Sequence, residues 1–139
     1  MLSMKETNNF QKENKMYGSN AHNIYAQNNI GIESPQKLIE MLYEGILRFN
    51  AQAKKAIKDK NIEKRVYFVN RSVAILTELV ATLDKSQGEI SLYLEGLYNY
   101  EIQLLTAAGV ESNLDKIDEV SKVFKVLLEV WRDTIDVAN

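Results

Sequence analysis

A regular spacing of apolar residues over positions 62–83 is the feature that most restricts how this chain can fold. The apolar residues recur at alternating intervals of four and three: Ile62, Val66, Val69, Val73, Leu76, Val80 and Leu83. Residues spaced in this way line one side of an α-helix, because a helix turns once in about 3.6 residues. Such a side has to be buried against other helices. The segment therefore predicts a helical bundle.

Similar spacing in three other segments predicts the remaining helices of this bundle. Ser34 and Pro35 predict the start of the first helix, because Ser is a favoured N-cap and Pro tolerates the first turn. The fold expected is all-α, an antiparallel four-helix bundle with a short N-terminal cap segment. The helices are predicted over about residues 35–58, 61–84, 88–108 and 114–136 of a single domain that covers residues 21–139, with the cap over 21–33 and a disordered extension over 1–20.

The boundaries of the third helix are predicted from local motifs. Ser86 with Glu89 and Ser112 with Asp115 have the spacing of capping boxes, which predicts that the third and fourth helices start there. Gly109 predicts the end of the third helix. The core seam of the third helix is expected to consist of Ile90, Leu94, Leu97, Leu104 and Ala108, with Glu101 interrupting it.

Composition argues against an enzyme and against metal or cofactor binding. The chain has no cysteine and a single histidine, His22, so it lacks the residues for zinc, haem or di-iron sites and for a nucleophile–histidine pair. With 17 basic and 19 acidic residues, the chain has no strong positive electrostatic field that would favour the binding of nucleic acid. It also has no apolar run long enough for membrane insertion. We therefore expect a cytoplasmic protein that is not an enzyme and needs no cofactor.

The second and third predicted helices carry more apolar residues than a single seam requires. A bundle helix needs about three apolar positions in seven, and both helices exceed this number. Gly45 and Gly96 lie inside helices, where a glycine often allows another backbone to approach. Two interpretations are open. The extra residues either enlarge the core beneath the cap segment, or they form a groove for a partner helix or an extended peptide.

Several motifs in order resemble one protein family. They are "YAQNNIGIESPQKLIEMLYEGIL", with Tyr25 ten residues before Pro35, then "GEI", "LYNY" and a late Trp-Arg pair. From about Tyr25 to Trp131 the sequence resembles the flagellar secretion chaperone family FliS. The resemblance implies a cytoplasmic chaperone that binds the disordered C-terminal segment of flagellin, prevents premature polymerisation and aids delivery to the type III export gate. Some members also bind an anti-sigma factor or an assembly regulator.

The resemblance and the residue pattern together suggest where a partner binds. Tyr25 matches a family tyrosine tied to flagellin binding, and we expect a groove built largely from the second and third helices. The expected contacts are Tyr25, Ile30, Tyr67, Phe68, Ile75, Leu79, Tyr93 and Tyr100. The alternative is a self-associating structural or regulatory bundle, or one that binds a different helical partner.

Overall fold

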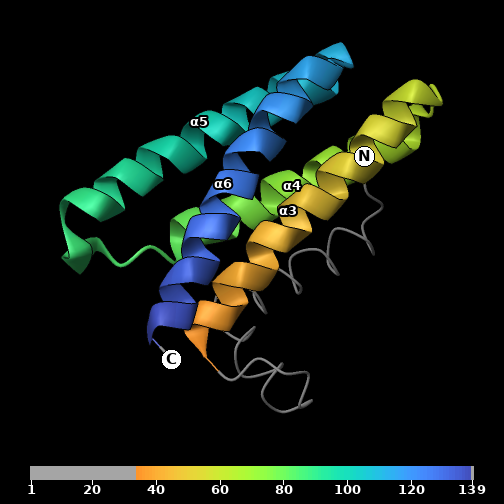
Figure 1. The fold of residues 1–139 in the computed structure, drawn as a ribbon. Coiled ribbons are helices and arrows are strands. Elements are labelled where there is room, and N and C mark those ends of the chain that lie inside the picture. The colour runs from red at the N-terminus through yellow and green to blue at the C-terminus, as the bar shows by residue number, and fades with distance from the viewer. Residues whose placement is uncertain (1–33, 139) are drawn as a thin grey trace, which may run out of the picture.

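The computed structural model describes residues 34–138, which form four long helices and one short 3-10 turn (Figure 1). The elements are α3 (Pro35–Lys58), α4 (Ile62–Ala81), η2 (Lys85–Gln87), α5 (Glu89–Glu111) and α6 (Leu114–Ala138). No strand occurs in this range, so the all-α bundle is confirmed. The predicted extension and cap segment, with His22, Tyr25 and Ile30, lie outside the described residues.

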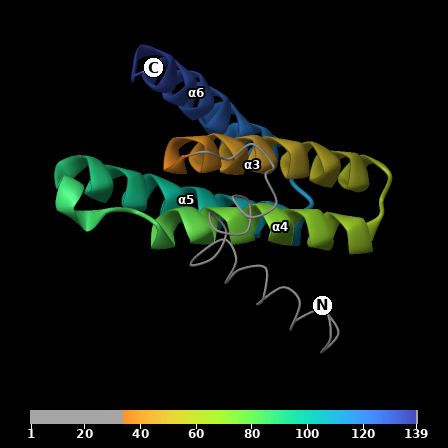
Figure 2. The ribbon, with the colours of Figure 1, turned by 90° about the horizontal axis from the view of Figure 1, so that it is seen from below.

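The four helices pack in a ring. α3 packs against α4 and α6, and α5 packs against the same two helices. Figure 2 shows α3, α4 and α5 side by side, with α6 crossing α3 at an angle. α5 and α6 meet at their connection and spread apart toward the start of α5 and the end of α6 (Figures 1 and 2). The α5–α6 junction therefore lies across the ring from the α3–α4 junction.

Polar caps define where the helices begin. As predicted, Ser34 caps α3, with its hydroxyl accepting a hydrogen bond from the Lys37 backbone N–H at 3.3 Å. The predicted box of Ser86 with Glu89 is wrong. Asp84 instead accepts a hydrogen bond from the Ser86 backbone N–H at 2.9 Å and caps η2. Ser86 is therefore part of η2 and does not cap α5. α4 correspondingly ends at Ala81, before this turn.

The connection between α5 and α6 also differs from its prediction. α5 continues past Gly109 to Glu111, and its C-cap residue Ser112 has φ 55° in the left-handed region. A Cβ at Gly109 would lie 3.0 Å from Cγ1 of Val69, so this glycine allows close packing of α5 on α4. The Ser112–Asp115 box is wrong as well, because the side chain of Asn113 caps α6.

The core combines apolar packing with a few paired polar groups. Phe124 of α6 lies between two tyrosines, with ring centroids 5.5 Å from Tyr43 of α3 and 6.2 Å from Tyr98 of α5. The hydroxyls of these tyrosines lie 2.6 Å apart in a buried hydrogen bond. Asn50 donates to Ser121, 3.1 Å away, which joins α3 to α6 inside the bundle. Each pair satisfies groups that would be costly to bury alone.

Candidate partner-binding surface

α5 carries a second apolar stripe beside the one that faces the core. Its residues repeat at intervals of three and four, as Ile90, Tyr93, Leu97, Tyr100, Leu104 and Ala107, and we call them the α5 stripe. Ile90, Tyr93 and Tyr100 are 61%, 68% and 52% exposed, while Leu97 and Leu104 are half-buried. Spacing of this kind is typical of a helix surface that packs against another helix. None of the helices in the described part covers these three exposed side chains.

Of the residues predicted for the core side of α5, Ala108 is buried and Leu94 and Leu104 pack against the core, whereas the other buried positions lie about one residue away from the predicted ones. The structure buries Ser91, Tyr98, Glu101, Leu105 and Ala108. Ile90, predicted to belong to the core, is exposed instead. α5 is apolar around much of its circumference, so its own sequence does not specify which side faces inward. The packing of α4 and α6 decides this.

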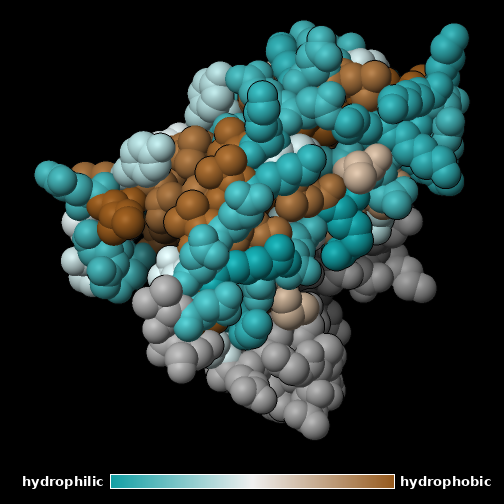
Figure 3. Space-filling model, viewed as in Figure 1, coloured by the Kyte–Doolittle hydropathy of each residue, from teal (hydrophilic) through white to brown (hydrophobic). Residues whose placement is uncertain are grey.

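α6 adds apolar residues to the same region. Val126 and Val130 are each more than half exposed. Together with the α5 stripe they form what we call the α5–α6 face. Figure 3 shows apolar surface along α5 and in the angle between α5 and α6. Of nine exposed large apolar residues in the described part of the chain, five lie on α5, two on α6 and none on α3. Exposed apolar residues are thus concentrated on α5 and α6, and five of these nine belong to the α5–α6 face.

A buried carboxyl group lies next to this face. Glu101 is 2% exposed, and its Oε2 atom has no hydrogen-bond partner. Burial, with a smaller contribution from the nearby charge of Glu119 on α6, raises the pKa of Glu101 to about 7. A buried acceptor without a donor is costly, so this part of the α5–α6 junction is weakly stabilised.

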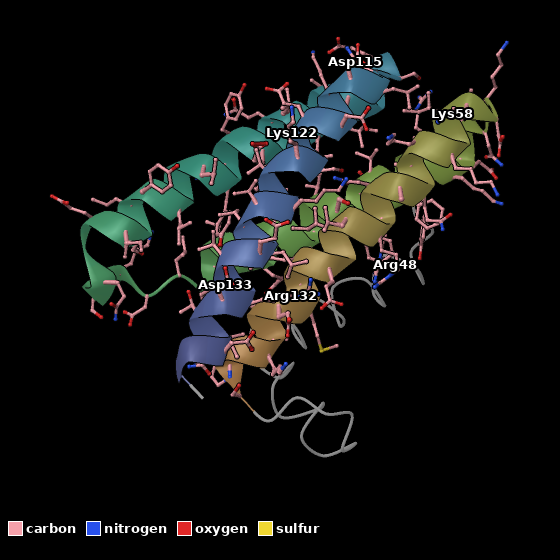
Figure 4. The ribbon with its side chains drawn as sticks, in the orientation of Figure 1. Arg48, Lys58, Asp115, Lys122, Arg132 and Asp133 are labelled. Atoms are coloured by element: carbon pink, nitrogen blue, oxygen red, sulfur yellow. The ribbon has the colours of Figure 1, made fainter. Side chains whose placement is uncertain are left out.

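A second, aromatic region lies across the ring, where α3 meets α4. The rings of Phe49 and Phe68 stack with centroids 6.2 Å apart, and Tyr67 meets Phe68 edge-on. The guanidinium groups of Arg48 and Arg71 each lie 5.2 Å from the Phe49 ring, within the range of cation–π attraction. Arg48 is labelled on α3 in Figure 4.

The structure separates the residues predicted to contact a partner. Tyr67 and Phe68 belong to the α3–α4 aromatic region, whereas Tyr93 and Tyr100 belong to the α5 stripe across the ring. Ile75 and Leu79 are buried in the core. Tyr25 and Ile30 lie outside the described residues, so their contact with a partner stays a prediction.

Several residues of the α5–α6 face were not among the predicted contacts. Ile90, Leu97 and Leu104 were assigned to the core, and Val126 and Val130 were not singled out. The signal that could have found them is a second row of apolar residues on α5, also spaced by three and four. This row runs beside the core seam and is shifted from it by one residue. On α6 the same signal is the spacing of Val123, Val126 and Val130.

Two features of the described residues bear on other functions. No group of three or more acidic, histidine or cysteine side chains there could hold a metal ion. None of the described helices is both long enough and apolar enough to span a membrane. The α5–α6 face is therefore the surface of the described residues that most needs a functional explanation.

Comparisons with known proteins agree with the fold. A family model described as "Flagellar protein FliS" matches residues 18–138. "Flagellar secretion chaperone FliS" of Campylobacter jejuni is 60% identical over 119 residues, covering 85% of this chain and 93% of that protein. "Flagellar secretion chaperone FliSB" of Pseudomonas aeruginosa is 32% identical over 121 residues, covering 84% and 96%. The FliS of Escherichia coli is 26% identical over 128 residues, covering 86% and 93%. This chain belongs to the FliS family of flagellar secretion chaperones.

Proposed function

We propose that this protein is a cytoplasmic export chaperone for flagellin. It binds the C-terminal segment of flagellin, prevents premature polymerisation and aids delivery to the flagellar type III export apparatus. Family membership supports the general role. The observation that carries the choice of surface is the exposed α5 stripe with its helix-packing spacing. An export-gate component, an anti-sigma factor or an assembly regulator would act as a further partner of the loaded chaperone.

An apolar stripe suits a client that is disordered when free. Such a segment loses conformational entropy when it binds, so it needs a large apolar contact area to reach useful affinity. An amphipathic helix can place its apolar side along a stripe of this spacing. Tyr93 and Tyr100 are the principal contacts in this proposal, because a tyrosine combines apolar area with a hydroxyl that can remain hydrated.

Whether the other predicted contacts touch the client depends on how far the client extends over the bundle. Tyr67 and Phe68 become contacts if the client also wraps over the α3–α4 aromatic region. Ile75 and Leu79 become contacts only if the client enters the core, since both are buried in the unbound chain.

The test is calorimetric titration with the last 40 or so residues of flagellin from the same bacterium, a length able to bury a large apolar area. We expect saturable binding with a large negative heat-capacity change. Replacing both Tyr93 and Tyr100 by Ala should weaken binding by more than about ten-fold while unfolding changes little, because both side chains are largely exposed. Asn99→Ala with Thr106→Ala, exposed on the other flank of α5, is the matched control.

Three outcomes separate the possibilities. Absence of binding by an intact, disordered peptide excludes flagellin as the client. Binding that the tyrosine variant leaves unchanged excludes the α5–α6 face as the contact surface. A weaker affinity in Tyr67→Ala extends the contact to the α3–α4 aromatic region, whereas an unchanged affinity limits it to the α5–α6 face.

The second candidate function is self-association through the same face. The observation that favours it is again the exposed apolar stripe, which two copies could bury against each other. Light scattering over a range of concentrations distinguishes the two functions. A tight dimer that does not bind the flagellin peptide would support self-association.

A further inference from the structure

Among the residues that the structure describes, no packing contact explains Gly96 of α5. A Cβ at Gly45 would lie 2.9 Å from Cδ1 of Ile75, and one at Gly109 would lie 3.0 Å from Cγ1 of Val69. These two glycines therefore permit close packing of the bundle. Around Gly96, in contrast, no atom of residues 34–138 lies within 4 Å of an added Cβ. Glycine inside a helix is less favourable than alanine, and here no packing within the described bundle offsets this cost.

The neighbours of Gly96 give it a distinctive position. Tyr93, Gly96, Leu97 and Tyr100 occupy positions i, i+3, i+4 and i+7 of α5. Four residues with this spacing form the hole that receives a side chain from a facing helix in knobs-into-holes packing. Since glycine has no side chain, one corner of this hole is open. We call these four residues the Gly96 socket.

We propose that the Gly96 socket receives a bulky apolar side chain, such as leucine, methionine or an aromatic residue, from a client helix packed along the α5 stripe. The two exposed tyrosines flank this side chain, and the missing Cβ gives it room. The identity of the client rests on the proposed function, whereas the socket is defined by the geometry of α5.

Charge restricts the client helix further. α5 contains no lysine or arginine and four glutamates. Glu95 and Glu111 are paired with Lys85 and Lys116, and Glu101 is buried, which leaves the charge of Glu89 beside the start of the α5 stripe. An acidic client helix would be repelled at this end of the stripe, whereas neutral or basic flanks would be accepted. The occupant that fits is therefore an amphipathic helix with a large apolar residue in its seam and few acidic residues beside it.

The test compares stability and binding in the full-length protein with Gly96→Ala and Gly96→Met. Both substitutions favour the helix, so the unfolding temperature should rise by about 3 °C for the alanine variant. Affinity for the flagellin C-terminal peptide should nevertheless fall about ten-fold with alanine and further with methionine, because the added atoms fill the socket. Asn99→Ala is the control. It should stabilise the exposed helix without changing affinity.

A second measurement identifies the side chain that enters the socket. Each bulky apolar residue of the peptide is replaced in turn by alanine and titrated against both the wild-type protein and Gly96→Ala. One residue should lose most of its contribution in Gly96→Ala while the others keep theirs, because only directly contacting pairs show such coupling.

Each outcome has a defined meaning. If Gly96→Ala raises the unfolding temperature and leaves affinity within two-fold of wild type, the socket is wrong and the flagellin proposal stands. A lower unfolding temperature would assign Gly96 a structural role and also overturn the inference. If the wild-type protein does not bind the peptide, the proposed function and the inference built on it both fall.

Discussion

The two long edges of α6 are built differently. Toward α3, Arg132 donates hydrogen bonds to Glu40 at 2.8 Å and to Glu44 at 3.0 Å (Figure 4). The indole N–H of Trp131 donates to the backbone carbonyl of Gln36 at 2.8 Å. Lys54 of α3 forms an ion pair with Asp118 at the other end of this edge. Polar contacts thus hold α6 to α3 along most of its length.

Toward α5, the same helix has few such contacts. An ion pair of Lys116 with Glu111 lies beside the connection. Farther along, Glu101 and Glu119 place two carboxyl groups near each other, and beyond them the helices spread apart with exposed apolar residues on both (Figure 1). At the α3 edge, the polar groups of α6 find hydrogen-bond and ion-pair partners on α3. At the α5 edge, apolar side chains stay exposed and the buried carboxyl of Glu101 has an oxygen without a hydrogen-bond partner. Such an edge is suited to a partner that completes it.

The largest expected effect comes from removing what both edges share. Phe124 contacts Tyr43 on the α3 side and Tyr98 on the α5 side. Phe124→Ala should therefore lower the free energy of unfolding by about 3–5 kcal/mol, from lost apolar burial and the cavity left behind. Urea denaturation monitored by circular dichroism measures this loss. A loss below about 1 kcal/mol would mean that the aromatic cluster is not a common anchor for the two edges.

A smaller, pH-dependent effect should be specific to the α5 edge. Because the folded-state pKa of Glu101 is raised to about 7 from its ordinary 4.5, the folded chain holds a proton that the unfolded chain releases between these values. The contribution of Glu101 to stability should be fully present below pH 4.5 and should be lost as pH rises through about 7. The loss should amount to up to about 3 kcal/mol.

Glu101→Gln isolates this contribution, because the amide has nearly the same shape and does not titrate. The variant should be more stable than wild type at pH 8 and should lose this advantage at acid pH. Burial also raises the pKa of Glu78, but Glu78 is present in both proteins, so the difference between their pH curves reports on Glu101. If the free energies of unfolding of the variant and the wild type change in parallel from pH 4 to 8, Glu101 does not have the raised pKa that its burial without a partner implies.

The smallest effect is expected at the α3 edge. Arg132→Gln removes the hydrogen bonds to Glu40 and Glu44, which lie at the protein surface, so the unfolding temperature should fall by no more than about 2 °C and less in high salt. The Arg132 hydrogen bond lowers the pKa of Glu40. Its contribution is therefore present above pH 4.5 and is lost as pH falls below that value. Calorimetric scans at two salt concentrations test this, and a salt-independent change would be inconsistent with an ion pair.

The features of the fold that the sequence predicted correctly depend on residues close together in the chain. The spacing of apolar residues in α4 and the Ser34–Pro35 start of α3 act within a few residues, so they could be read without knowledge of any neighbour. The wrong capping boxes show the limit of such motifs. Asp84 accepts from the Ser86 backbone N–H that the first box would have used, and Asn113 caps α6 one residue later than the second box predicts. The turn geometry that favours these two residues depends on how adjacent helices are joined.

The binding surface was only partly predictable. Tyr93 and Tyr100 were predicted to contact a partner, and both lie on the α5–α6 face. Tyr67 and Phe68 were also predicted contacts but lie across the ring. An excess of apolar residues on a helix does not show toward which side of the bundle each side chain points. The structure also explains Gly45 through its close approach to Ile75, while it leaves Gly96 open.

By itself, the sequence determined that this chain forms four amphipathic helices, because that signal is carried by residue types at short, regular intervals. Its resemblance to one family of chaperones rested separately on several motifs in order. Tertiary structure decided which side of α5 faces the core. A helix that is apolar around most of its circumference has several inward orientations of similar hydrophobic gain. The neighbouring α4 and α6 select one of them, and that choice leaves the α5 stripe exposed.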